Sequence, residues 1–332
     1  MATVAAAGAA AAASATTAAV VAVEEEEEEA TTTYNNHNSS TTTTTTKNNN
    51  NKTVSKSSSV ESTTKLTCVA TNVYTLLYPI HFGGCEFFSR MTIVRLNDGS
   101  NSLWIHSPCE ITKKEIQDMI VKQFGGTSSN TITVTVKYIV APGNYHHLHV
   151  KSCQDEYPDA KTYISPGIES KRPDLKYDVI LNDDSDSQRT PFSNEIEHVI
   201  LSGNSIINEI VFYHKCSKTL IVVDSIEYIG DQTVEKYGTS STNWILRFFW
   251  KYVLKMWNVP KPAPEYQIGW FLRKMKCTTK GGLEESKRCM EKILEWDFER
   301  VILAHGDNIE TTHGGESAKD VVKRAWKGIL GE

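Results

Sequence analysis

The sequence has little of the positive charge that a nucleic-acid-binding protein needs, and no Lys or Arg precedes Lys47. Its formal net charge is −5, and the run of glutamates at 24–29 accounts for more than that, so the rest of the chain is nearly neutral. Binding to nucleic acid depends on clustered basic residues that neutralise phosphates. The charge balance therefore argues against nucleic acid as a partner.

We expect neither a secretory signal nor a transmembrane segment in this sequence. A secretory signal places basic residues before an apolar core, whereas none precedes the weakly hydrophobic, Ala-rich stretch at 2–22. The Trp-rich stretch 244–257 carries frequent basic residues and is too short to span a bilayer. Its helical spacing favours a helix packed on the domain, with a helix lying at a membrane surface as the alternative.

C-x-x-C pairs are absent as well, although the chain has 7 cysteines. The cysteines are odd in number and widely scattered, a distribution typical of unpaired thiols in a reducing compartment. We therefore expect a cytoplasmic protein.

Residues 1–66 have few large apolar side chains and consist mainly of Ala, Glu, Thr, Asn and Ser. Such tracts cannot bury enough apolar surface to offset the loss of chain entropy on folding. We expect a disordered low-complexity tail over 1–66. The remaining residues, 67–332, are numerous enough for one domain with a substantial core.

Apolar patterns in this domain predict strands and helices in mixed order. Runs at 91–96 and 103–106 flank the turn 97–99, as in a hairpin, and Thr112 and Glu115 have the spacing of a capping box. The other expected elements are strands at 131–140, 161–164, 196–201, 209–213, 219–223 and 300–304, helices at 146–157, 268–275, 283–296 and 318–330, and a stiff proline-rich linker at 260–264. This order predicts sheets covered by helices, in an α/β or α+β architecture.

Four candidate metal ligands stand just beyond predicted strands. They are His146, His147, Asp224 and His305. Open sheets gather functional groups at strand ends, where imidazole and carboxylate groups from distant parts of the chain can share one ion. The alternative is that the histidines are exposed or hydrogen-bonded and that Asp224 only caps the following turn.

Two stretches of the domain carry a family resemblance. The first is 92–104, with Thr92–Leu96, Asp98-Gly99 and Leu103-Trp104, and the second is 157–163. The first is similar to the first hairpin of the metallo-β-lactamase superfamily, and specifically of an uncharacterised branch of it, and the second is similar to the segment that follows the metal motif of that superfamily. The resemblance implies an αββα sandwich with metal ligands on loops along one edge of two sheets.

The same resemblance implies one lost and one retained metal site. Residues 141–147 correspond to the motif T-H-x-H-x-D-H, but Pro142 and Asn144 replace its early histidines and Asn204 replaces a third. Proline has no ligating side chain and Asn is a poor zinc ligand. The second site would consist of His146, His147, Asp224 and His305, which implies one zinc or iron ion, or none if the geometry fails. Four ligands would close a tetrahedral zinc site, as in structural sites.

Two further histidines are accessory candidates. His149 is close enough in sequence to replace His146 as a ligand or to act as a proton shuttle, and His106 at a strand end could line the pocket. A structural histidine is the alternative for each.

Two functions are consistent with this sequence. The first is a metal-dependent hydrolase of a small ester, thioester or amide that uses the single residual site. The second is a non-catalytic protein of the same fold that binds a ligand or partner. The substrate and the oligomeric state are not predictable from the sequence.

Overall fold

The structure of the protein is a computed structural model, which describes residues 65–82, 85–100, 102–125, 134–182, 189–204, 206–231, 233, 251–252, 255–274, 282–311 and 315–331. The chain divides into two units, the first of which comprises Ser62–Ile80 and Glu86–Glu332. Nearly all of the expected tail at 1–66, and most of the expected helix at 244–257, lie outside the described residues. The fold and the candidate site belong to the first unit.

The larger sheet has the strand order β1-β2-β3-β4-β5-β6-β7 within the described residues. Its strands are β1 (Thr67–Ala70), β2 (Val73–Phe82), β3 (Cys85–Arg95), β4 (Leu103–His106), β5 (Val136–Ala141), β6 (Lys161–Ile164) and β7 (Val179–Ile180). Strands β3 and β4 pair antiparallel, as expected for the hairpin, and β4 to β7 pair parallel. Helices α2 (Lys114–Phe124), α3 (Val150–Glu156) and α4 (Ile168–Lys171) lie in the connections between the parallel strands. The carboxyl ends of β4 and β5 therefore meet at one edge.

The smaller sheet has the order β12-β11-β10-β9-β8. Its strands are β8 (Ile196–Leu201), β9 (Glu209–His214), β10 (Thr219–Val222), β11 (Arg300–Leu303) and β12 (Ile309–Glu310), and the helices α7 (Pro264–Lys274), α8 (Gly282–Ile293) and α9 (Ala318–Leu330) follow β10 in the chain. Strands β8, β9 and β10 are antiparallel, whereas β10 and β11 are parallel, with Val222 opposite Leu303. This pairing brings together two strand ends that are far apart in the sequence.

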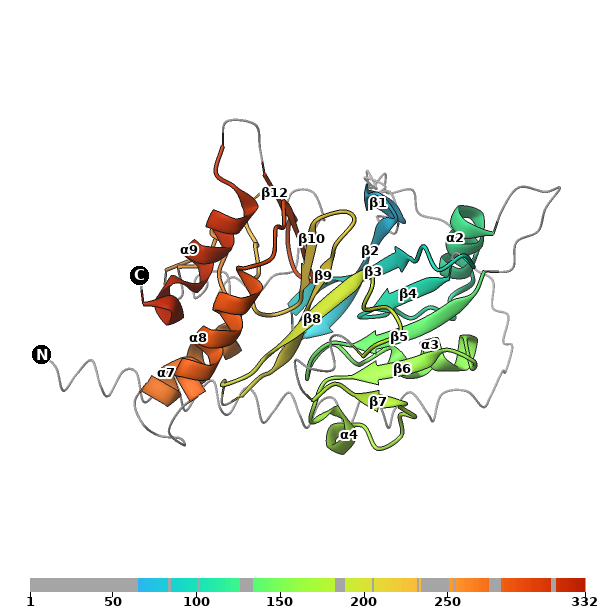
Figure 1. Ribbon diagram of the computed structural model, residues 1–332, viewed down its shortest axis with the longest axis horizontal. Helices are drawn as coiled ribbons and strands as arrows, with labels where there is room; N and C mark the ends of the chain where they lie inside the picture. The colour runs from blue at the N-terminus through green and yellow to red at the C-terminus, as the bar shows by residue number, and fades with distance from the viewer. Residues whose placement is uncertain are drawn as a thin grey trace, which may run out of the picture. The chain divides into compact units, whose positions relative to one another are not determined.

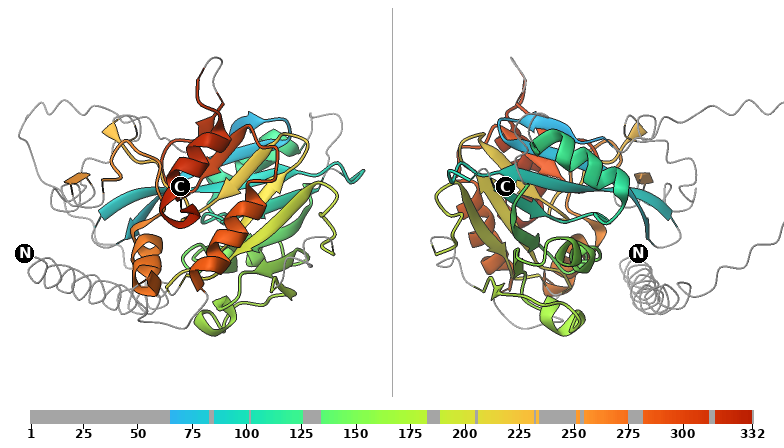
Figure 2. Two further views of the ribbon diagram at one scale, coloured as in Figure 1. Left: turned by 60° about the vertical axis from the view of Figure 1, so that its left-hand side comes forward. Right: turned by 90° about the vertical axis from the view of Figure 1, so that its right-hand side faces the viewer.

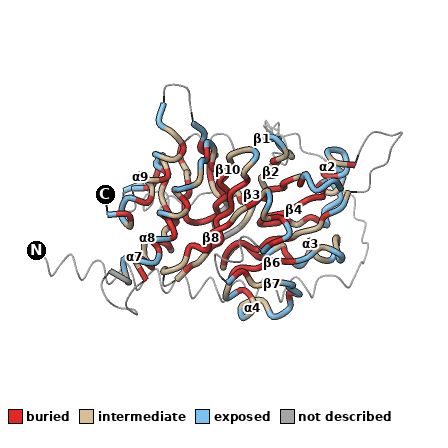
Figure 3. Tube along the Cα trace, in the orientation of Figure 1, coloured by how far each residue is buried: buried red, intermediate tan, exposed pale blue. Residues whose placement is uncertain are grey.

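Three apolar clusters give the layers of the fold. Trp104 and Val140 of the larger sheet share one cluster with Phe212 and Ile302 of the smaller sheet, so the two sheets pack face to face. A second cluster joins the smaller sheet to α7, α8 and α9, and a third joins the larger sheet to α2, α3 and α4. Figures 1 and 2 show the two groups of helices beside their sheets, and Figure 3 shows the buried strands between them. The expected αββα arrangement is confirmed.

Three local expectations were wrong. The capping box does not form, because Ile116 and Gln117 donate their N–H groups to the carbonyl of Lys113, which makes Lys113 the N-cap without a side-chain bond. The helix expected at 146–157 begins only at Val150, since the preceding residues form turns. Pro264 belongs to the first turn of α7 rather than to a linker, a position where proline loses no helical hydrogen bond.

No helix in the described part of the chain is long and apolar enough to cross a membrane.

Candidate metal centre

The candidate site lies where strands from both sheets end. His146 stands in the turn after β5, Asp224 follows β10, and His305 follows β11. Because β10 and β11 are parallel and in register, Asp224 and His305 leave the smaller sheet at the same edge. The turn that carries His146 reaches this edge from the larger sheet through an antiparallel bridge between Gly143 and Glu209.

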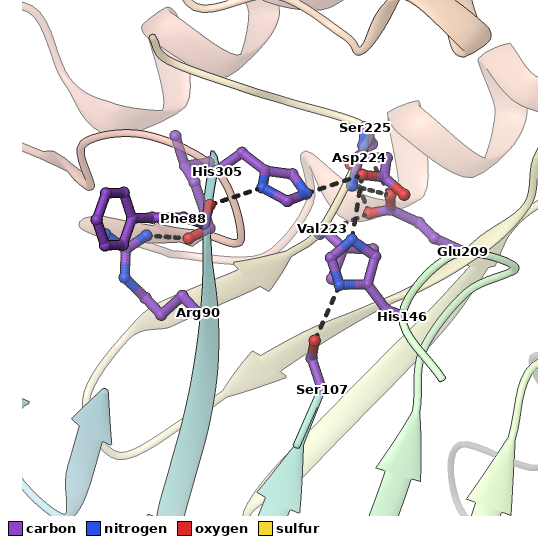
Figure 4. A network of polar contacts seen from close by, with 10 residues as sticks. Phe88, Arg90, Ser107, His146, Glu209, Val223, Asp224, Ser225 and His305 are labelled. Atoms are coloured by element: carbon purple, nitrogen blue, oxygen red, sulfur yellow. Dashed lines mark hydrogen bonds and ion pairs between the residues drawn. The ribbon is translucent and has the colours of Figure 1, made fainter. Parts of the chain in front are cut away.

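These three side chains face one another at close range (Figure 4). Oδ1 of Asp224 lies 3.2 Å from Nε2 of His146 and 3.6 Å from Nε2 of His305. One ligand atom from each of the three residues lies within 4.8 Å of the others. His146 and Asp224 are buried and His305 is largely buried, so water competes little for these atoms.

The far nitrogen of each imidazole has an oxygen partner. Nδ1 of His305 lies 2.9 Å from the carbonyl oxygen of Phe88, which can only accept, so Nδ1 carries the proton. Nδ1 of His146 lies 2.9 Å from Oγ of Ser107. Metal-binding histidines are commonly oriented in this way, with the second nitrogen bonded to an oxygen. The arrangement points the Nε2 lone pair of His305 toward the centre of the group.

The charges of the group fit a cation. Burial lowers the pKa of His305 to about 4, and its neutral ring therefore presents a lone pair to the Asp224 carboxylate with no proton between them. Burial alone would raise the pKa of Asp224, but the neighbouring His146 outweighs it and the pKa is lowered. The second carboxylate oxygen, Oδ2, is buried without a hydrogen-bond partner among the described residues. Two facing acceptors and an unpartnered anionic oxygen are what a bound cation would satisfy.

Two buried charged residues hold the backbone of the site. The carboxylate of Glu209 accepts hydrogen bonds from the residues around Asp224, and burial together with the charge of Asp224 raises the pKa of Glu209 to about 7. The guanidinium of Arg90, only 3% exposed, donates to the carbonyl oxygens of Leu303 and Gly306 on either side of His305. Sequence reasoning missed both residues, and also Ser107. The one local signal was a charged residue, Glu209, at the start of an apolar strand.

The structure does not bring His147 into the group. Nδ1 of His147 lies 3.3 Å from Nη1 of Arg172, which can only donate, so this nitrogen accepts and Nε2 carries the proton. Burial, with Lys171 and Arg172 nearby, lowers the pKa of His147 to about 3. A protonated Nε2 offers no lone pair to a metal. The structure therefore groups three of the four ligands expected from the sequence and leaves His147 outside the group.

The two accessory candidates also lie apart from the group. His149 precedes α3 and packs edge to face on the ring of Tyr78. His106 is buried between the sheets, stacked on Trp104 with Phe212 at its edge, and burial lowers its pKa to about 3. Within the described part of the chain, neither histidine is hydrogen-bonded to the side chain of His146, Asp224 or His305.

The positions where the superfamily motif is lost make structural contacts. The carbonyl of Pro142 accepts from Ile210, and the side chain of Asn204 accepts from Ile206 and Ile207 and donates to the carbonyl of Tyr266. Asn204 therefore ties the loop after β8 to α7.

Comparisons with known proteins agree with this fold. Residues 84–248 match the family model described as a domain of unknown function, DUF4336. The structure of the TMB-1 protein is similar to the chain with a TM-score of 0.50 and 11% identity, covering 81% of this chain and 97% of that one. A metallo-β-lactamase from Pontibacter korlensis has a TM-score of 0.47 at 11% identity, and the match covers 81% of this chain and 100% of that one. A putative diflavin flavoprotein fragment from Nostoc has a TM-score of 0.46 at 10% identity, and the match covers 80% of this chain and 96% of that one.

No curated protein matches the sequence. Identity near 11% shows a likeness of fold and does not carry over an activity. The chain has the metallo-β-lactamase fold and, over residues 84–248, matches the domain of unknown function DUF4336.

Proposed function

We propose that the protein is a metal-dependent hydrolase that holds a single zinc or iron ion with His146, Asp224 and His305 and acts on a small ester, thioester or amide. The observation that carries the proposal is the convergence of two imidazole nitrogens on one buried carboxylate from three distant strand ends. These donors suit zinc, and two histidines with one carboxylate also suit ferrous iron.

A set of three protein ligands supports catalysis better than four would. Catalytic zinc sites keep one position for water or substrate, whereas a fourth protein side chain closes the tetrahedron. With His147 turned toward Arg172, the chain supplies three ligands. An ion at this position would lower the pKa of a bound water and polarise a substrate carbonyl.

The chain's own residues would perform the other tasks. Ser107 and the carbonyl of Phe88 hold the two rings in fixed orientations, so that little reorganisation is needed on binding. The burial of His146 and Asp224 excludes bulk water and strengthens electrostatic interactions at the site.

Metal content is the first test. We would measure zinc and iron by mass spectrometry in the full-length wild type and in the Asp224→Ala, His305→Ala and His147→Ala variants. About one ion per chain is expected in the wild type and in His147→Ala, with loss in the other two, because His147 lies outside the group. His147→Ala is the matched control, as a buried histidine adjacent to a ligand. A folded wild type without metal would favour the non-catalytic alternative.

Turnover is the second test. Ester, thioester and amide chromogenic substrates would be screened with the wild type before and after chelation and after metal is restored. We expect turnover that chelation abolishes and that zinc or iron restores. Full turnover in a His305→Ala variant that retains one ion per chain would contradict the proposal.

A further inference from the structure

Glu209 is a fully buried carboxylate that faces the turn carrying Asp224 (Figure 4). One oxygen, Oε2, accepts from the backbone N–H of Asp224 at 2.8 Å and from that of Ser225 at 2.6 Å. The other, Oε1, accepts from the hydroxyl of Ser225 at 2.6 Å and from the N–H of Val223 at 3.3 Å. Each residue of the 223–225 turn therefore donates to this one side chain.

The backbone of Glu209 contacts the other ligand-bearing turn. Glu209 forms an antiparallel bridge with Gly143, and the N–H of Ile210 donates to the carbonyl of Pro142 at 2.6 Å. Gly143 in turn accepts from the N–H of His146 at 3.1 Å. Glu209 is thus bonded on one side to the turn of Asp224 and on the other to the turn of His146.

The carboxylate of Glu209 has hydrogen-bond donors but no cationic partner among the described residues. Its four donors are neutral N–H and O–H groups, which stabilise the carboxylate without cancelling its charge. Asp224 carries a second carboxylate on the turn that Glu209 holds. A cation bound between His146, Asp224 and His305 would offset the repulsion between these two groups.

We propose that Glu209 is a positioning residue for the metal centre, which holds the turns of Asp224 and His146 in register so that their side chains converge. The inference rests on the proposed function only in taking the ligand of the site to be a metal ion. Glu209 is not among the grouped ligand residues, so an ion held by His146, Asp224 and His305 would be positioned by Glu209 only through the two turns. Its contribution is to ligand geometry and to the negative potential at the site.

The test is the Glu209→Gln variant of the full-length protein. Glutamine keeps the size of the side chain but replaces one acceptor oxygen by an NH₂ donor, which faces N–H groups of the turn. Metal-free protein would be titrated with Co²⁺ to obtain the dissociation constant and the visible absorption spectrum of the bound ion. Thermal unfolding of the metal-free forms would measure folding separately.

Glu197→Gln is the matched control. Glu197 is on the neighbouring strand β8 and bonds to Lys215 and Trp296, away from both turns. We expect Glu209→Gln to bind Co²⁺ about 10- to 100-fold more weakly and with an altered spectrum, as for other residues that orient ligands. Glu197→Gln is expected to keep the wild-type affinity and spectrum.

An unchanged dissociation constant and spectrum in folded Glu209→Gln would overturn the inference. If that variant does not fold, Ser225→Ala removes one donor to Oε1 and leaves Glu209 in place. It is expected to weaken Co²⁺ binding several-fold, and unchanged binding would overturn the inference equally. Failure of the hydrolase proposal looks different, because it would leave Co²⁺ binding intact in the wild type and show no turnover; a wild type that binds no Co²⁺ overturns both.

Discussion

His146 and His147 are adjacent in the chain, yet their rings belong to separate networks. Nε2 of His146 lies 3.2 Å from Asp224, whereas Nδ1 of His147 lies 3.3 Å from Arg172. The turns between Gly143 and Val150 direct the two side chains apart. One neighbour is therefore a candidate ligand and the other is its natural control.

Ser107→Ala is expected to weaken metal binding. The substitution removes the hydroxyl 2.9 Å from Nδ1 of His146 and frees the ring to rotate. We expect the dissociation constant for Zn²⁺ or Co²⁺ to rise about 10-fold or more. Ser165→Ala, which removes a buried hydroxyl bonded to Asn208 instead, should leave it unchanged. Equal affinities in the two variants would show that Ser107 does not orient the ring.

Gly306→Ala is expected to destabilise the protein and to displace His305. Gly306 has φ +94°, and a Cβ there would meet the carbonyl oxygen of Tyr228 at 1.9 Å. The clash and the left-handed backbone together should cost about 2 to 4 kcal/mol. At Gly331, with φ +83° and nothing within 4 Å of a Cβ, the same change should cost about 1 kcal/mol. Urea unfolding of both variants measures the difference, and equal losses would show that the close approach is unimportant.

Asn204→Ala should reduce stability without changing metal content. It removes acceptors for the N–H groups of Ile206 and Ile207 and a donor to the carbonyl of Tyr266. Leaving such groups unsatisfied costs about 1 kcal/mol or more each. Asn182→Ala, which removes one bond of an exposed side chain, should change the unfolding free energy little. Loss of the ion from Asn204→Ala would instead give this residue a part in the metal site.

Stability should fall in mild acid because of His214. Burial lowers the pKa of this histidine to about 4, below its usual value near 6.5. The unfolded chain therefore takes up a proton between about pH 6.5 and pH 4 while the folded chain does not, so the free energy of unfolding decreases as the pH falls through this window. The decrease is at most about 1.4 kcal/mol per pH unit.

His214→Gln should remove that part of the pH dependence. Urea unfolding of wild type and variant in chelator, at pH 7.5, 6 and 5, would measure it. Other buried histidines contribute equally to both proteins, so the difference between the two slopes reports His214 alone. Parallel slopes would contradict the prediction.

The fold was largely predictable from the sequence. Turn residues at 97–99 and the apolar runs beside them predicted the hairpin of β3 and β4. The mixed order of strands and helices indicated sheets covered by helices. Helix starts were less predictable. Thr112 and Glu115 have the spacing of a capping box that would begin the helix at Lys113, but α2 begins one residue later, at Lys114, with Lys113 as its N-cap.

The candidate site was predictable in its parts and not in its arrangement. Placement after strands singled out Asp224 and His305, which parallel pairing of β10 and β11 brings together. Whether His146 or His147 joins them depends on the path of one turn, which periodicity does not encode. Arg90 contacts Leu303 and Gly306 from more than two hundred residues away, and no local pattern reveals such a contact.

The wide spacing of the three grouped residues also affects when the site can form during synthesis. His305 follows His146 by 159 residues along the chain, and ribosomes add about 5 to 20 residues per second, so roughly 8 to 32 s pass between the two. In the later part of that interval, after β10 has been translated, the nascent chain has β5 and β10 but lacks β11, the strand that leads into His305. An ion held by all three residues would therefore have to be acquired late, when β1 to β11 have already been translated.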